Sequence, residues 1–142
     1  MDAQTRRIES ILGDGKNQSF GEAVKAFYEY LCRELELPCE VTGIEDFRWE
    51  ERYVIGPGDL KEYERLKKSR PSYRDHYELL ATQAGVVSDW MLFPGDDIGA
   101  HVRRKSDGKE FCLGLAELKA VKRRSRNAQL LDDFAVFLVN NR

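Results

Sequence analysis

Three pairs of adjacent acidic residues are the part of this sequence best suited to bind a metal ion. Each pair falls in a predicted loop or at the end of a predicted strand, where separate segments can meet. Ca²⁺ takes about six to eight oxygen ligands, and carboxylates from several loops can supply them. The EF-hand spacing Asp-x-Asp-x-Asp-Gly is missing, so the alternative interpretation is ordinary surface charge. The candidate ligands are Glu45, Asp46, Glu50, Glu51, Asp96 and Asp97.

Basic residues gather in two places that could bind another macromolecule, and Trp49, Tyr53 or Trp90 could stack on bases if exposed. The chain has 23 Lys and Arg against 25 Asp and Glu, whereas nucleic-acid domains usually carry a basic excess. The pattern therefore favours a solvated face and makes nucleic acid a weaker candidate than a protein partner. The basic candidates are Arg103 and Arg104 near a hairpin tip and Lys119, Lys122, Arg123, Arg124 and Arg126 before the last helix.

The sequence offers little to a catalytic mechanism. Its two histidines, His76 and His101, fall in charged or outward-facing positions. The common nucleophile, zinc-protease, P-loop and dinucleotide motifs are missing. Three cysteines without Cys-x-x-Cys spacing make neither a disulfide framework nor a zinc knuckle, although a metal site combining Cys39 or Cys112 with a histidine stays open. We therefore expect a protein that is not an enzyme.

The composition is that of one globular domain. A chain of 142 residues buries roughly two-thirds of its unfolded surface. Charged residues make up 34% of the chain and its net charge is -2, which argues against a nucleic-acid coat or a polybasic membrane anchor. No apolar run approaches the roughly 18 residues that span a bilayer, and residues 1–7 lack the apolar stretch of a secretory signal. We expect a cytoplasmic protein without membrane association.

An antiparallel hairpin at residues 98–115 is the centre of the predicted fold. Asp107-Gly108, flanked by alternating apolar residues, is a strong hairpin signal because both residues tolerate positive φ. A two-residue turn at this point pairs Val102 with Leu113 on the apolar face. The opposite face is charged, so the hairpin is predicted to form the middle of a small curled antiparallel sheet.

Amphipathic helices at the two ends of the chain are predicted to cover this sheet. Ser19 and Glu22 make a capping box for a helix that ends before Pro38. A second amphipathic helix is predicted over residues 127–140, where apolar residues recur at three-and-four spacing. A shorter helix is predicted over residues 3–12.

The remaining elements complete an α+β domain. The order strand, hairpin, 3₁₀ turn and closing strand is typical of an SH3-like barrel. The predicted fold is therefore a small antiparallel SH3-like barrel or curled sheet, packed by an N-terminal and a C-terminal amphipathic helix. The other predicted strands are residues 39–42, 53–55, 77–82, 90–93 and 119–121, with a 3₁₀ turn at 115–118. One domain is predicted over residues 1–142, with a helical N-terminus at 1–37, the sheet at 39–121 with a helical insertion near 59–75, and the C-terminal helix at 127–140.

Three segments resemble the small calcium-binding proteins of the cyanobacterial type, which lack EF-hands. The segments are Tyr30 to Cys39 (YLCRELELPC), Leu113 to Leu118 (LGLAEL) and Asp132 to Phe137 (DDFAVF). The resemblance implies a helix, an SH3-like sheet and a final helix in this order, together with Ca²⁺ binding. It identifies no ligand residue.

The sequence therefore predicts a non-enzymatic cytosolic binding protein, with Ca²⁺ as its most specific candidate ligand. The alternative is an interaction module that binds a protein or a nucleic acid. Such a module would use the barrel surface or the basic segment at residues 119–126.

Overall fold

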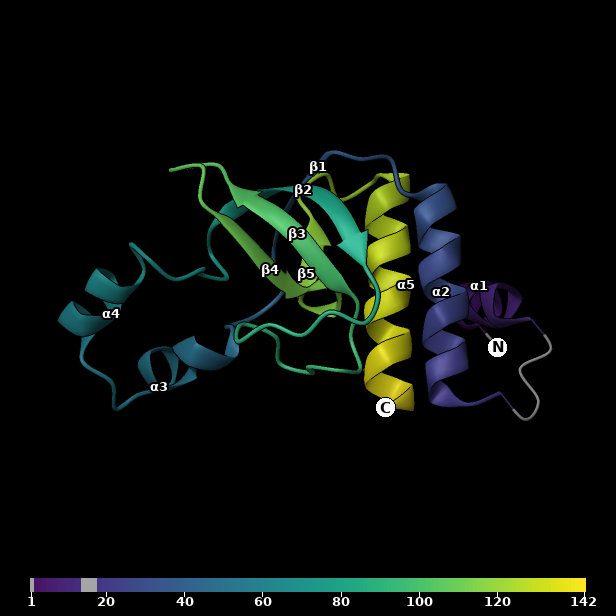
Figure 1. Ribbon diagram of the computed structural model, residues 1–142, viewed down its shortest axis with the longest axis horizontal. Helices are drawn as coiled ribbons and strands as arrows, with labels where there is room; N and C mark the ends of the chain where they lie inside the picture. The colour runs from purple at the N-terminus through teal and green to yellow at the C-terminus, as the bar shows by residue number, and fades with distance from the viewer. Residues whose placement is uncertain (1, 14–17) are drawn as a thin grey trace.

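The computed structural model describes residues 2–13 and 18–142, which form helices at both ends of the chain and a sheet between them (Figure 1). The predicted helical N-terminus is present in its described part as two helices. The helices are α1 (Ala3–Leu12), α2 (Phe20–Glu34), α3 (Glu51–Val54), α4 (Leu60–Leu66) and α5 (Arg126–Asn141), with 3₁₀ turns η1 (Arg48–Glu50) and η2 (Leu115–Glu117). The strands are β1 (Cys39–Gly43), β2 (His76–Gln83), β3 (Gly99–Arg104), β4 (Glu110–Gly114) and β5 (Leu118–Ala120).

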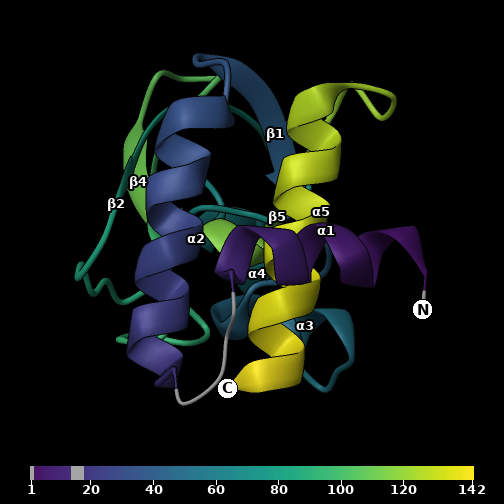
Figure 2. The ribbon, with the colours of Figure 1, turned by 90° about the vertical axis from the view of Figure 1, so that its right-hand side faces the viewer.

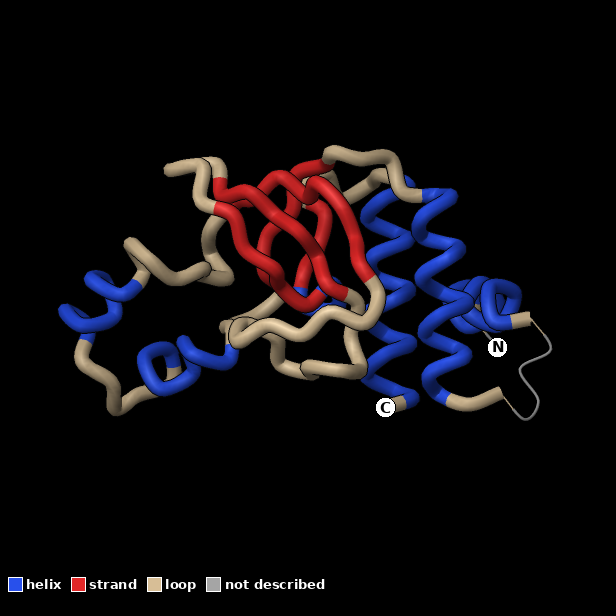
Figure 3. The backbone as a smooth tube through the Cα atoms, viewed as in Figure 1, coloured by secondary structure: helices blue, strands red, loops and turns tan. Residues whose placement is uncertain are grey.

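The strands form an antiparallel sheet in the order β4-β3-β2-β1-β5. In the described part of the chain, β4 and β5 are the edges of this sheet, and each has one strand neighbour. Figure 3 shows the strands curling over one another between the helical layer and the α3–α4 segment. The α+β class and the curled sheet are therefore confirmed. The sheet is open, and a closed SH3-like barrel is not observed.

Helices α2 and α5 run antiparallel and form one layer against the sheet, while α1 crosses them on the outside (Figure 2). The layer is held by aromatic packing, since Phe27 of α2 lies 5.3 Å from Phe134 and 5.1 Å from Phe137 of α5, measured between ring centroids. All three rings are buried. The caps follow the sequence signals: the hydroxyl of Ser19 accepts from the Glu22 N–H, which satisfies one of the free donors at the start of α2.

The central hairpin forms, but its turn is wider than predicted. Val102 pairs with Phe111 and not with Leu113. The loop between the strands comprises residues 105–109, in which Gly108 takes the positive φ of 77° that glycine tolerates. The predicted two-residue turn is therefore wrong. Because the register moves by two residues, each side chain keeps its predicted face of the sheet.

Two predicted strands are not strands. Residues 53–55 belong to a helical segment, in which Tyr53 stacks on Tyr63 of α4 at 5.1 Å between centroids. This aromatic contact favours two short helices packed on each other over an extended strand. Residues 90–93 form turns in a loop, with the Met91 N–H donating to the Ser88 carbonyl. The predicted helix inside the insertion is present as α4, capped by the Asp59 carboxylate.

None of the helices within residues 2–13 and 18–142 is long and apolar enough to cross a membrane.

The two faces of the hairpin predict a large difference in stability between a substitution on the buried face and one on the exposed face. Leu113 is 1% exposed, so Leu113→Ala is expected to lower the free energy of unfolding by about 2 to 5 kcal/mol. Arg103 is exposed on the opposite face, so Arg103→Ala is expected to cost under about 0.5 kcal/mol. Urea unfolding of both variants measures the difference. Equal losses would show that the hairpin faces are assigned incorrectly.

Candidate functional site

Two carboxylates meet where the sheet passes into η2. Asp97 comes just before β3 and is 4% exposed, and its carboxylate accepts the backbone N–H groups of Ile98 at 2.7 Å and Ala116 at 3.2 Å. Glu117 ends η2, and its carboxylate accepts the Leu92 N–H at 3.0 Å. The two acids are thus brought together by the loop before β3 and the turn after β4.

Gly114 lies directly beneath this carboxylate pair. A Cβ atom on Gly114 would lie 2.5 Å from Oδ2 of Asp97 and 2.5 Å from Oε2 of Glu117, closer than real Cβ contacts allow. The two oxygens are therefore no farther from each other than twice that distance. Only a residue without a side chain leaves room for both oxygens, so Gly114 forms the floor of an oxygen-lined hollow.

Burial makes both carboxylates hard to ionise. Removal from water, with a smaller contribution from the charge of Glu117, raises the pKa of Asp97 to about 7, although the backbone N–H groups of Ala116 and Ile98 oppose the shift. Burial likewise raises the pKa of Glu117 to about 7, and Glu45 adds to the shift. In the described part of the chain, no Lys, Arg or His side chain forms an ion pair with Asp97 or Glu117. Among the described residues, the two carboxyl groups therefore lie largely away from water without a basic side chain to stabilise their ionised forms.

A pocket of about 340 Å³ opens beside Glu117, between the loop after β1, the loop before β3, η2 and α5. Glu45 and Asp46, from the loop after β1, line it together with Asp132 of α5. Most of the other lining side chains are apolar, among them Leu92. The pocket therefore places loop carboxylates near the buried pair. In residues 2–13 and 18–142, no group of three or more His, Cys, Asp or Glu side chains is already close enough to hold a metal ion.

The remaining predicted ligands lie elsewhere. Glu50 is fully buried, and its carboxylate accepts the hydroxyl protons of Tyr63 at 2.6 Å and Ser72 at 2.7 Å and the Tyr73 N–H at 2.8 Å. These neutral donors occupy its oxygens, so Glu50 acts as a structural anchor of the η1–α3–α4 segment. Glu51 is exposed on α3.

Asp96 is 44% exposed in its side chain and forms an ion pair with Arg142 at 3.7 Å. Of the six predicted ligands, the structure therefore brings Glu45, Asp46 and Asp97 to one region. Glu117 was not predicted, because a single acid in a 3₁₀ turn carries no spacing signal. The only hint in the sequence is Gly114 three residues earlier.

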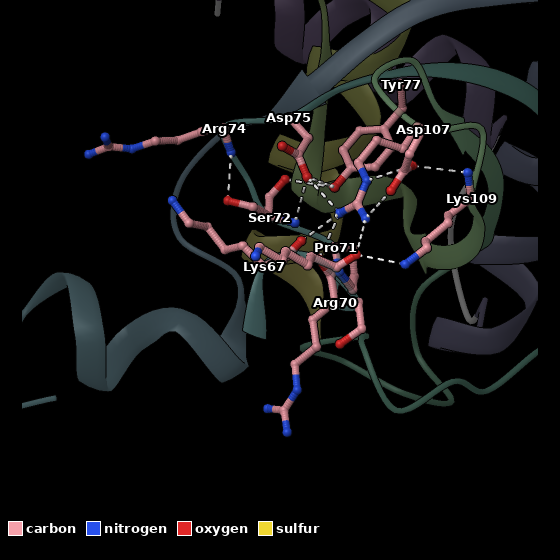
Figure 4. Close-up of polar contacts among 12 residues, drawn as sticks. Lys67, Arg70, Pro71, Ser72, Arg74, Asp75, Tyr77, Asp107 and Lys109 are labelled. Atoms are coloured by element: carbon pink, nitrogen blue, oxygen red, sulfur yellow. Dashed lines mark hydrogen bonds and ion pairs between the residues drawn. The ribbon is translucent and has the colours of Figure 1, made fainter. Parts of the chain in front are cut away.

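Arg104, which the sequence pattern placed with the surface arginines, is buried at 2% exposure. Figure 4 shows the polar cluster around it, with Asp75, Asp107 and Lys109 labelled. The Arg104 guanidinium donates to the Asp107 carboxylate at 3.0 and 2.7 Å and to the Asp75 carboxylate at 3.0 Å. The hydrogen bonds to Asp107 hold the wide hairpin loop and raise the pKa of Arg104 further. The guanidinium also donates to the backbone carbonyls of Lys67, Lys68 and Arg70. Arg104 therefore ties the end of α4 to the sheet and is not available to a partner.

The other basic candidates are on the surface. Arg103 forms an ion pair with Glu78 at 2.8 Å, and Arg126 forms one with Glu34 at 2.9 Å. The segment between β5 and α5 does gather its charges at two adjoining shallow pockets. The first is lined by Lys119, Arg123, Arg124 and Arg126, and the second by Lys122 and Arg126.

The raised pKa of Asp97 predicts a pH effect on stability. An acid whose pKa is higher in the folded state than in the unfolded state stabilises the fold below its ordinary pKa, and this contribution is lost as the pH rises through the folded value. Between about pH 4 and 7, the titration of Asp97 should therefore lower the free energy of unfolding by about 3 kcal/mol. Urea unfolding of wild type and Asp97→Asn across this range measures it. A constant difference between the two proteins would contradict the assignment.

No protein-family model matches the chain, and no curated protein matches it. The fold itself is that of a helix-covered antiparallel sheet, and two solved structures share it. One is described as a calcium binding protein in the calcium-binding form, with 16% identity, a TM-score of 0.58, and coverage of 99% of this chain and 92% of the other.

The second structure is CcbP from Anabaena, with 17% identity, a TM-score of 0.57, and coverage of 97% of this chain and 91% of the other. The resemblance to the small calcium-binding family is therefore confirmed in architecture. At sequence identities of 16% and 17%, the likeness establishes the fold alone.

Proposed function

We propose that this protein is a non-enzymatic, cytosolic calcium-binding protein whose site is built on Asp97 and Glu117. The observation that carries the proposal is the carboxylate pair over Gly114, formed by the buried Asp97 and the partly buried Glu117, for which no ion pair with a cationic side chain is found in the described chain. Two adjacent buried carboxylates repel each other unless a proton or a cation lies between them. A divalent cation would relieve this repulsion.

The donor set fits Ca²⁺ in its chemistry. The two side-chain donors over Gly114 are both carboxylate oxygens, which hard cations prefer. Ca²⁺ accepts irregular coordination completed by carbonyls and water, whereas Mg²⁺ demands near-ideal octahedral geometry. Glu45 and Asp46 at the adjoining pocket are the loop acids that could add ligands to the pair.

The comparisons support the same ligand. Both fold neighbours cover nearly the whole chain, and one is described as a calcium-binding protein in its calcium-binding form. The absence of catalytic motifs in the sequence supports a binding role over catalysis.

A thermal melt in Ca²⁺ and in Mg²⁺ tests the proposal. For a dissociation constant near 1 mM, about 10 mM Ca²⁺ should raise the melting temperature by about 3 to 5 °C, because the ligand binds only the folded state. Mg²⁺ at the same concentration should produce a smaller rise.

Two adjacent substitutions supply the matched control. Asp97→Asn should remove the Ca²⁺ response, whereas Asp96→Asn should keep it, because Asp96 pairs with Arg142 and the oxygens nearest Gly114 belong to Asp97 and Glu117. A response that survives Asp97→Asn unchanged would show that calcium binds elsewhere.

A further inference from the structure

A second pocket, of about 800 Å³, lies at the opposite end of the molecule from α5. It is formed by the η1–α3 segment, α4 and the loop at Asp89, in the region that Figure 1 shows projecting beyond the sheet. Four arginines line this pocket: Arg48, Arg52, Arg65 and Arg70. Such a density of guanidinium groups around one hollow is not required by the fold, because Arg48, Arg52 and Arg65 are exposed.

These arginines have no acidic partner within ion-pair distance among residues 2–13 and 18–142. Two of them are positioned by aromatic rings. The guanidinium of Arg52 lies 5.5 Å from the ring centroid of Tyr53, and that of Arg70 lies 5.4 Å from that of Trp49. Stacking on an aromatic face orients a guanidinium while leaving its charge and its N–H groups free for a ligand.

The aromatic rings beneath these arginines are held in place by packing and hydrogen bonds. Trp49, Tyr53 and Tyr63 pack as one cluster, with centroids 5.1 to 6.1 Å apart. The indole Nε1 of Trp49 donates to the Pro71 carbonyl at 2.6 Å, and Tyr63 donates to the buried Glu50. The pocket is therefore preorganised, which lowers the entropic cost of binding.

We propose that this pocket binds the phosphate group of a small phosphorylated molecule. A phosphate presents three or more acceptor oxygens, and planar guanidinium forks match that geometry bidentately. Three acids, Glu51, Glu62 and Asp89, also line the pocket, so its net charge is low. That balance suits one compact anion held by several arginines and opposes a long polyanion such as nucleic acid.

Calorimetric titration with inorganic phosphate and with pyrophosphate, in calcium-free buffer, tests this site independently of the calcium proposal. Pyrophosphate is expected to bind with a dissociation constant below about 1 mM. Removing Arg48 and Arg65 together, as Arg48→Gln with Arg65→Gln, should weaken that binding at least about tenfold, because each lost guanidinium removes charge-assisted hydrogen bonds. Both side chains are exposed, so the variant should melt like wild type.

The matched control removes the same charge from another surface, as Arg123→Gln with Arg124→Gln. This control variant should bind pyrophosphate like wild type. ADP provides a second arm: binding equal to that of pyrophosphate shows recognition of the phosphates alone, and tighter binding shows that the rest of the nucleotide contributes. No binding of pyrophosphate to wild type, or an equal loss in the two double variants, would overturn the proposal.

Discussion

Replacement of Arg104 by methionine is expected to lower the free energy of unfolding by more than about 3 kcal/mol. The Arg104 side chain is 3% exposed, and its guanidinium forms ion pairs with the carboxylates of Asp75 and Asp107. Its remaining N–H groups donate to three backbone carbonyls in the segment after α4. Methionine keeps much of the volume but leaves these acceptors without a donor, and an unpaired partly buried charge is costly.

Urea unfolding measures this loss, and Arg103→Met is its control. Arg103 precedes Arg104 on the same strand, but it is exposed on the other face and forms an ion pair with Glu78 at the surface. Its replacement should cost less than about 1 kcal/mol. If the two variants lose similar stability, Arg104 does not anchor α4 to the sheet.

Replacement of Glu50 by alanine is the second large expected effect, at about 3 kcal/mol. The carboxylate is fully buried and accepts from Tyr63, Ser72 and Tyr73. Alanine would leave these donors unsatisfied and would open a cavity under the aromatic cluster. Glu50→Gln, which keeps the volume and one acceptor oxygen, should lose less.

The control is Glu51→Ala, because Glu51 is the adjacent acid and is exposed. Unfolding by urea should show a cost under about 0.5 kcal/mol for this variant. The Ca²⁺ response of Glu50→Gln distinguishes a structural role of Glu50 from a role in metal binding. Glu50→Gln should keep the full Ca²⁺ response, and loss of that response in a folded Glu50→Gln protein would assign Glu50 to the calcium site.

The helices could be predicted from sequence because their signals are local. Ser19 and Asp59 cap helices with side-chain oxygens a few residues from the N–H groups they satisfy. The helical form of residues 53–55 could not be predicted, because it depends on a ring contact between Tyr53 and Tyr63 across a turn. Tertiary packing overrides the strand preference of a short aromatic and β-branched run.

The hairpin shows the same limit on a smaller scale. Asp107-Gly108 correctly predicted a turn, and its alternation correctly predicted both faces. The width of the loop depends on the bond between Asp107 and the guanidinium of Arg104, whose burial follows from the position of α4. A charged residue at an inward position of a strand was the available signal for a buried ionic network.

Some residues of the candidate site could be predicted from local sequence signals, and others depend on the fold. Acidic pairs next to strand ends pointed to Asp97 and to the loop acids Glu45 and Asp46, which adjoin the pair or its pocket. The partner of Asp97 is Glu117, twenty residues later in the chain, and only the fold brings them together over Gly114. No sequence pattern distinguishes the buried Asp97 from Asp96 beside it.

Calorimetric titration of the protein with Ca²⁺ at pH 8, for wild type and for Asp97→Asn with Glu117→Gln, tests the calcium assignment most directly. Wild type should give a saturable isotherm and the double variant none. Without calcium, the variant should melt at least as high as wild type, because two neighbouring like charges that are poorly solvated at pH 8 are removed. A flat wild-type titration, or the same isotherm in both proteins, would contradict the assignment and leave a macromolecular partner at the basic segment 119–126 as the leading alternative.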